Sequence, residues 1–155
     1  MKKYINAVLI GAVSFLTGFI FGGKMLVSMV NDYKKRMDRN LSNMMLLNDW
    51  LEFLYSGGRV DQYFYKHGYK RIMIYGNGYI GKRLKQALEQ TDIEVIAIMD
   101  KVTLKGESEL IIGVDSEIPD VDCIVITPIF YYDELFIQLK EKTNIPIVSM
   151  QMVIE

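Results

Sequence analysis

"RIMIYGNGYIGKRLKQAL", residues 71–88, is the stretch that decides the fold. Its first five residues are mostly apolar and are typical of a short strand. Three spaced glycines follow, and then a segment in which Ile80, Leu84 and Leu88 recur at helical spacing. A strand that runs through glycines into a helix is the arrangement in which a loop and a helix N-terminus hold a phosphate. The sequence therefore predicts a nucleotide-type loop between this strand and this helix.

Strand-like and helix-like segments alternate after this loop. Strands are expected over residues 94–99, 110–114, 122–127 and 145–149, and a second helix over residues 132–142. This alternation predicts a small α/β, Rossmann-like domain over residues 69–155, with a parallel sheet in the order 3-2-1-4-5. The link between the second and fourth strands is too short for two full helices. We therefore expect one face of the sheet to be thinly covered.

The glycines form a G-x-G-x-x-G motif at Gly76, Gly78 and Gly81. We expect Gly76 to make the tight turn, Gly78 to let a phosphate approach the backbone, and Gly81 to let the helix pack on the sheet. The helix N-terminus and its dipole favour an anion at this place. The predicted ligand-binding loop consists of Gly76, Asn77, Gly78, Tyr79, Ile80 and Gly81.

Further groups are expected at the same edge of the sheet. Asp100 ends the second strand, and its carboxylate would accept a hydrogen bond from a ribose 2′-hydroxyl. Asp100 favours an unphosphorylated ribose over a ribose with a 2′-phosphate, although the positive charge of the adjacent Lys101 weakens that preference. Thr127 and Pro128 follow the fourth strand, and Thr127 would donate to a phosphate or a sugar. The alternative is that the glycines make only a structural turn and that the domain binds no ligand.

The amino-terminal segment has a different character. Residues 4–23 contain no charge and are mostly apolar, and twenty helical residues measure about 30 Å, the thickness of the hydrocarbon core. We expect a transmembrane helix over residues 4–30, with a cleaved signal peptide as the main alternative. Five basic residues follow the apolar stretch and two precede it, which favours a single-pass protein of the cell membrane with a cytoplasmic carboxyl-terminal domain. Small residues at positions 7, 11, 14, 18 and 22 form a stripe suited to packing against another helix.

Residues 31–68 are expected to be a helical connector. Positions 37, 41, 44, 48, 51 and 55 recur at spacings of four and three, and all are apolar except Asn48. This seam would serve either a coiled-coil dimer or the docking of the helix on the globular domain, and the spacing favours neither. Gly57 and Gly58 are expected to end the helix, and a second short helix is expected to end at Gly68.

Composition limits the chemistry of the chain. The 155 residues carry a net charge of −1, which gives no indication of nucleic-acid binding. A single cysteine excludes an intramolecular disulfide, and Cys123 lies in an apolar run where a buried thiol is expected. His67 is the only histidine, so the sequence offers no partners for a metal site or a histidine-dependent triad.

Residues 70–101 and 118–150 resemble small Rossmann-like modules of bacterial polysaccharide biosynthesis. The resemblance extends over roughly residues 46–155, and such modules occur beside sugar transferases, sugar acetyltransferases and nucleotide-sugar epimerase-like proteins. It implies that NAD(P) or a nucleotide sugar is the ligand and that Gly76, Gly78, Gly81 and Asp100 line its site. The transmembrane helix is an addition to that pattern.

A membrane-anchored, non-catalytic binding protein is the function that the sequence predicts. Epimerases and short-chain reductases of this superfamily use a Tyr-x-x-x-Lys pair, and no such pair occurs in this chain. We expect a nucleotide- or nucleotide-sugar-binding accessory protein in cell-surface polysaccharide assembly, with a second copy or a membrane glycosyltransferase as partner. Two alternatives remain open: an NAD(P)-dependent epimerase- or reductase-like enzyme, and a membrane scaffold whose degenerate Rossmann domain binds proteins.

Overall fold

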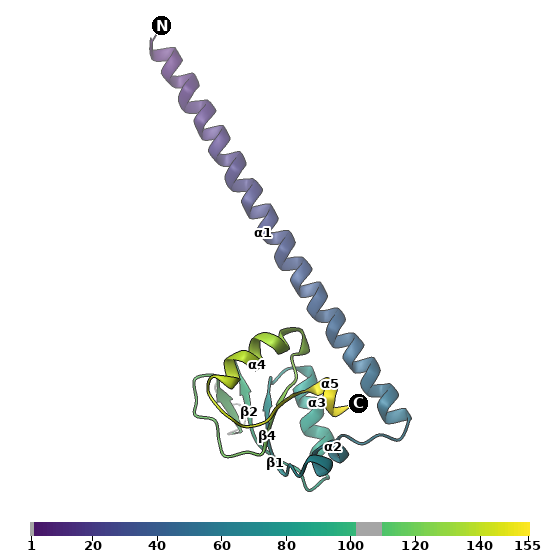
Figure 1. The fold of residues 1–155 in the computed structure, drawn as a ribbon. Helices are drawn as coiled ribbons and strands as arrows, with labels where there is room; N and C mark the ends of the chain where they lie inside the picture. The colour runs from purple at the N-terminus through teal and green to yellow at the C-terminus, as the bar shows by residue number, and fades with distance from the viewer. Residues whose placement is uncertain (1, 102–109) are drawn as a thin grey trace. The chain divides into compact units, whose positions relative to one another are not determined.

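The computed structural model describes residues 2–101 and 110–155, without the side chains of residues 2–17 and 20. It divides into two compact units, residues 1–40 and residues 41–155. Helix α1 (Lys2–Tyr55) supplies the first unit and continues into the second (Figure 1). The unit boundary falls inside residues 31–68, the expected connector.

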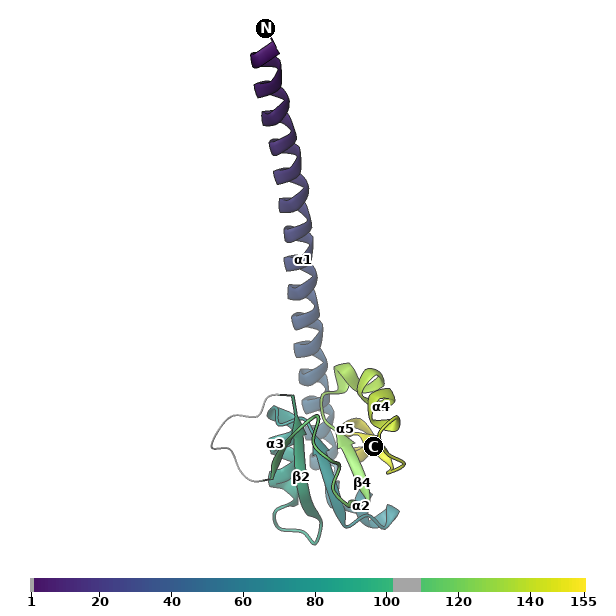
Figure 2. The same cartoon turned by 90° about the vertical axis from the view of Figure 1, so that its left-hand side faces the viewer.

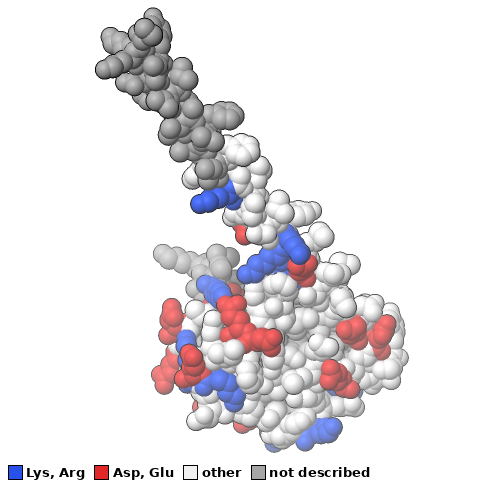
Figure 3. Space-filling model, turned by 45° about the horizontal axis from the view of Figure 1, so that its top comes forward, with Lys and Arg blue, Asp and Glu red and all other residues white. Residues whose placement is uncertain are grey.

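The first unit is the amino-terminal part of α1. The transmembrane helix was predicted over residues 4–30, and the side chains of about half of it, residues 4–17 and 20, lie outside the described part of the structure. Among the residues that are described, none belongs to a helix both long and apolar enough to cross a bilayer. Lys and Arg side chains follow along α1, as the blue groups next to the grey segment show (Figure 3). In the sequence, the basic residues of α1 after residue 23 are Lys24, Lys34, Lys35, Arg36 and Arg39.

The second unit is built on a five-stranded parallel sheet (Figures 1 and 2). Its strands are β1 (Arg71–Tyr75), β2 (Glu94–Asp100), β3 (Ile111–Gly113), β4 (Cys123–Ile126) and β5 (Ile147–Ser149). They lie in the order β3-β2-β1-β4-β5, and each neighbouring pair is parallel. The α/β class, the parallel sheet and the strand order predicted from the sequence are confirmed.

Helices cover the two faces of this sheet unequally. The end of α1, α2 (Val60–His67), α3 (Tyr79–Leu88) and α5 (Met150–Val153) share one buried cluster. Helix α4 (Tyr132–Lys140), after a short 3-10 turn at Ile129–Tyr131, packs on the other. The four-residue α5 was not expected from the sequence.

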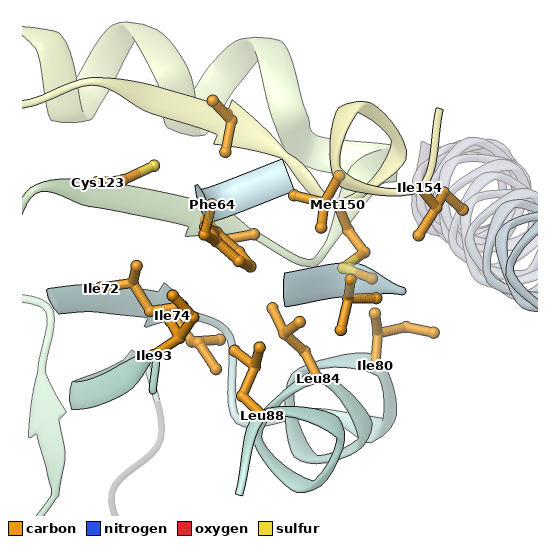
Figure 4. Close-up of a cluster of buried hydrophobic side chains, with 14 of the residues drawn as sticks. Phe64, Ile72, Ile74, Ile80, Leu84, Leu88, Ile93, Cys123, Met150 and Ile154 are labelled. Carbon is orange, nitrogen blue, oxygen red and sulfur yellow. The ribbon is translucent and has the colours of Figure 1, made fainter. Parts of the chain in front are cut away.

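The core alternates across β1 because successive strand residues point to opposite faces. Ile72 and Ile74 join the cluster under α3, while Met73 and Tyr75 join the cluster under α4. Figure 4 shows the first cluster, in which Phe64 of α2 meets side chains of the sheet and of α3. Both faces of β1 are therefore buried, as its apolar sequence predicts.

The end of α1 belongs to the first cluster. Leu46 and Trp50 are 1 % and 5 % exposed, and Phe53 packs against the same side chains. The seam identified in the sequence lies on a different face of the helix and is exposed. Its described apolar members in the second unit are Leu41, Met44, Leu51 and Tyr55. The helix thus docks on the domain, but not through the seam.

Candidate functional site

The glycine loop lies at the carboxyl end of β1 and begins with a turn that requires glycine. Gly76 has a φ of +107°, in the left-handed region that side chains disfavour. A Cβ at this position would stand 2.7 Å from Oγ1 of Thr127 and 3.0 Å from Cδ of Pro128. Its N–H donates to the carbonyl oxygen of Met99 at 2.7 Å, which ties the turn to β2.

Gly81 and Gly78 have opposite surroundings. Gly81 is buried, and a Cβ at this position would overlap the carbonyl oxygen of Gly76. Only glycine at position 81 therefore allows α3 to approach the loop this closely. A Cβ on the exposed Gly78 would meet no atom within 4 Å. The turn at Gly76, the open approach at Gly78 and the close packing at Gly81 are the local geometry expected from the motif.

Backbone N–H groups lie at the start of helix α3, next to the glycine loop. Gly78 is the N-cap of α3, and no side-chain cap hydrogen bond is made there. The helical pattern begins where Lys82 N–H donates to the carbonyl oxygen of Gly78 at 3.1 Å. The N–H groups of the first turn have no intrahelical acceptor and carry the positive end of the helix dipole. The exposed Tyr79 ring lies beside this turn, 5.3 Å from the Arg83 guanidinium carbon.

Asp100 reaches the loop from the end of β2. Its Oδ2 accepts a hydrogen bond from the backbone N–H of Asn77 at 2.5 Å. The sequence correctly places this carboxylate beside the glycines. Because a negative charge already lies on the Asn77 amide, a phosphate is better accommodated at the first turn of α3 than at Asn77 itself. Lys101 follows as an exposed residue.

Thr127 and Pro128 support the loop from behind. Thr127 is 2 % exposed, and its hydroxyl lies 3.0 Å from the carbonyl oxygen of Tyr75 and 3.3 Å from that of Gly76. Its proton is therefore directed to the main chain, which corrects the prediction from the sequence that Thr127 donates to a ligand. Pro128 packs beside Gly76, as the short distance from a Cβ at that position shows.

A groove of about 380 Å³ begins at Asn77 and follows one face of α3. The helix contributes Lys82, Lys85, Gln86 and Glu89, and the sheet side contributes Ile98, Leu110 and Ile111. Spacings of three and four residues place these helical side chains on one face. The opposite face carries Leu84 and Leu88 into the core. The groove lies between α3 and the strands β2 and β3.

The lining of the groove is only partly anticipated by the sequence. Asn77 was predicted, and Lys82 stands in the first turn of a helix already assigned to anion binding. Lys85, Gln86 and Glu89 were missed. Their spacing along α3, on the side of the helix opposite Leu84 and Leu88, is the signal that identifies them. Two lysines against one glutamate give this wall a net positive charge.

Other reactive side chains of the described residues lie apart from the loop. Cys123 is buried at the start of β4, and burial raises the pKa of its thiol to about 12. His67 is exposed, with Nδ1 2.7 Å from the carbonyl oxygen of Tyr63. Across the described residues, no group of three His, Cys, Asp or Glu side chains is arranged to hold a metal ion.

The comparisons with protein families, curated proteins and solved structures found no match.

Proposed function

We propose that residues 41–155 bind a phosphate-bearing nucleotide ligand, NAD(P) or a nucleotide sugar, at the glycine loop and the adjoining groove. The observation that carries the proposal is the geometry of the loop: glycine is sterically required at Gly76 and Gly81, while Gly78 opens to solvent. A purely structural turn has no need of that opening. The ligand's phosphate would lie at the first turn of α3, where backbone donors and the helix dipole converge.

The groove indicates the size and charge of the ligand. Ligand pockets in proteins usually measure about 300–1,000 Å³, so 380 Å³ suits one nucleotide better than a whole dinucleotide. Lys82 and Lys85 would attract a second anionic group, and Ile98 and Ile111 offer an apolar surface to a base or a sugar ring. A nucleoside diphosphate with a small substituent combines these features.

Asp100 favours a free ribose diol. Its carboxylate is held at the loop by the Asn77 N–H, and a carboxylate in this place accepts hydrogen bonds from ribose hydroxyls. A 2′-phosphate would meet a negative charge instead. We therefore expect NAD and UDP-sugar ligands to bind better than NADP.

The wider role is a membrane-anchored, non-catalytic accessory protein of cell-surface polysaccharide assembly. The apolar residues 4–23 and the basic residues after them support a single membrane span with a cytoplasmic domain. The resemblance of residues 46–155 to modules of polysaccharide biosynthesis supports the pathway. The missing Tyr-x-x-x-Lys pair argues against an epimerase or reductase.

A ligand panel tests the binding proposal. The full chain in detergent micelles is heated with NAD, NADP, UDP-glucose, UDP or inorganic phosphate, and unfolding is followed by fluorescence of Trp50, the only tryptophan. We expect UDP or UDP-glucose to raise the melting temperature and the paired substitutions Lys82→Ala and Lys85→Ala to reduce that rise. Lys66→Ala, an exposed lysine of α2, is the matched control. No shift with any nucleotide would favour the scaffold alternative, and turnover of UDP-glucose would favour the enzyme.

Membrane anchoring is tested separately. We expect the chain to remain in the membrane pellet after alkaline extraction, and protease added to inside-out vesicles to digest residues 41–155. Release of the chain at high pH would contradict the anchor without bearing on ligand binding.

A further inference from the structure

Helix α1 has two apolar faces on opposite sides. With Leu41 assigned to position a of a heptad abcdefg, the docked residues Leu46 and Phe53 occupy position f and Trp50 occupies position c. Positions f and c lie across the helix from a and d, because each residue turns the helix by about 100°. The docking of α1 on the domain therefore leaves the a/d face uncovered.

The a/d face continues beyond the seam first identified in the sequence. Its a and d positions from residue 27 to residue 55 are Val27, Val30, Lys34, Met37, Leu41, Met44, Asn48, Leu51 and Tyr55. Each apolar member is at least 52 % exposed, and beyond residue 30, where the predicted transmembrane helix ends, such side chains are normally buried. Seven apolar positions over four heptads, interrupted by Lys34 and Asn48, are the pattern of a coiled-coil seam.

We propose that α1 pairs through this face with α1 of a second copy of the chain, in a parallel, in-register coiled coil. The proposal is independent of the nucleotide site. Positions a, d, e and g between residues 27 and 55 number seventeen per helix, somewhat fewer than the roughly 20–30 residues per partner of a standard interface. The dimer should therefore be concentration-dependent and favoured where the chains are held close together.

The charges of α1 suit this arrangement. The basic residues Lys35, Arg36 and Arg39 fall at positions b, c and f, outside the seam. A parallel pair brings each g residue beside the e residue five places on in its partner. These pairs join residues 33 to 38, 40 to 45 and 47 to 52, and none contains two like charges. Lys34 can keep its ammonium group in water by extending its long stem.

Asn48 determines whether the two α1 helices run parallel or antiparallel. In a parallel, in-register pair, position a meets position a, so the two Asn48 amides face and hydrogen-bond each other. In an antiparallel pair, position a meets position d, and Asn48 would be buried against an apolar side chain. In the single chain, Nδ2 of Asn48 donates to Oε1 of Glu52 at 3.2 Å on the helix surface. Only the parallel register gives this amide a partner inside the seam.

The stripe of small residues is a different surface. Gly18 and Gly22 occupy positions f and c of the same heptad frame, away from the a/d face. A Cβ at either position would meet no atom within 4 Å in the single chain. The two surfaces can therefore be tested independently.

Cysteine cross-linking of the full chain in detergent micelles tests the dimer. The native Cys123 is buried and should not react. Leu41→Cys places a thiol at position a, and Asp49→Cys places one at the exposed position b as the matched control. We expect Leu41→Cys chains to form disulfide-linked dimers rapidly under mild oxidation and Asp49→Cys chains to remain monomeric. Equal cross-linking of both variants, or none of Leu41→Cys, would overturn the proposal.

Three further variants test the register and the surface. Preferential cross-linking of Leu41→Cys chains to Leu51→Cys chains, rather than each to itself, would overturn the parallel register. Leu41→Glu combined with Leu51→Glu should convert the chain to a monomer in sedimentation, while Trp50 fluorescence confirms that the domain is folded. Gly18→Leu should leave the dimer unchanged. Loss of the dimer in Gly18→Leu, with the double glutamate variant still dimeric, would assign association to the stripe.

Discussion

The carboxylate of Asp100 lies 2.5 Å from the backbone nitrogen of Asn77, so the last residue of β2 is fastened to the loop that follows β1. Neighbouring parallel strands end at the same edge of the sheet, which brings residues 23 positions apart into contact. The contact fixes the loop and at the same time places a negative charge at the expected ribose position. It therefore links the conformation of the loop to the kind of nucleotide that the site accepts.

Asp100→Asn should weaken binding of ligands with a free ribose diol. A hydrogen bond to a charged acceptor contributes about 1.5–3 kcal/mol, against about 0.5–1.5 kcal/mol for a neutral pair, so we expect roughly a tenfold loss of affinity. NADP should lose less than NAD, because the repulsion of its 2′-phosphate is removed. Titration calorimetry measures both ligands, with the exposed Asp92→Asn as control. Equal affinities for the native chain and Asp100→Asn would contradict the assignment.

Alanine at Gly81 and at Gly78 should have opposite effects. At Gly81 the added Cβ overlaps the backbone oxygen of Gly76, and relieving such overpacking costs about 1–3 kcal/mol of stability. At Gly78 the methyl group enters open space at a φ of −75°, so the stability should change little. The methyl would obstruct a phosphate there, and ligand binding should fall. Urea unfolding and nucleotide titration of both variants distinguish the two roles; normal binding by Gly78→Ala would show that the phosphate does not approach the backbone at Gly78.

Leu46→Ala should destabilise the globular domain although Leu46 lies in α1. The side chain is 1 % exposed within the cluster that includes Trp50 and Phe64, and truncation of a buried leucine costs about 2–5 kcal/mol. Leu54→Ala is the matched control, because Leu54 is 49 % exposed on the same helix. Chemical denaturation followed by Trp50 fluorescence measures both. Equal stability of the two variants would show that α1 does not stabilise the domain.

The sequence correctly predicts those features of the fold that depend on the local pattern of residues. Arg71–Tyr75 is apolar enough to identify a buried central strand, and the spacing of the glycines identifies the turn and the close packing of α3. The position of Asp100 follows from strand order alone, since β1 and β2 are neighbours. These features need no knowledge of distant side chains.

Features that depend on distant contacts were missed. Helix α1 has apolar residues on two faces, so spacing alone did not distinguish the seam from the docked face of Leu46 and Trp50. The hydroxyl of Thr127 was expected at the ligand, but only the folded chain shows the carbonyl oxygens of Tyr75 and Gly76 beside it. The groove along α3 depends on how this helix packs beside β2 and β3, which only the folded domain shows.

Acid should destabilise the domain through two aspartates. The guanidinium of Arg59 hydrogen-bonds the buried Asp61 and lowers the pKa of that carboxyl. The backbone N–H groups of Arg71 and Lys70 donate to Asp122 at 2.8 and 2.7 Å and lower its pKa also. A carboxyl whose pKa is lower in the folded state stabilises the fold above its unfolded pKa of about 3.9, and this contribution is lost as the pH falls through the folded value.

The melting temperature should therefore fall steeply below about pH 4. Asp122→Asn should lower it at pH 7, because a neutral amide is a weaker acceptor for the two N–H groups at the start of β1. The same substitution should reduce the dependence on pH, since one of the protonating groups is gone. Melting curves between pH 2 and pH 7 compare this variant with the exposed Asp115→Asn. An identical pH dependence in the native chain and Asp122→Asn would show that the contact between Asp122 and β1 does not contribute to acid unfolding.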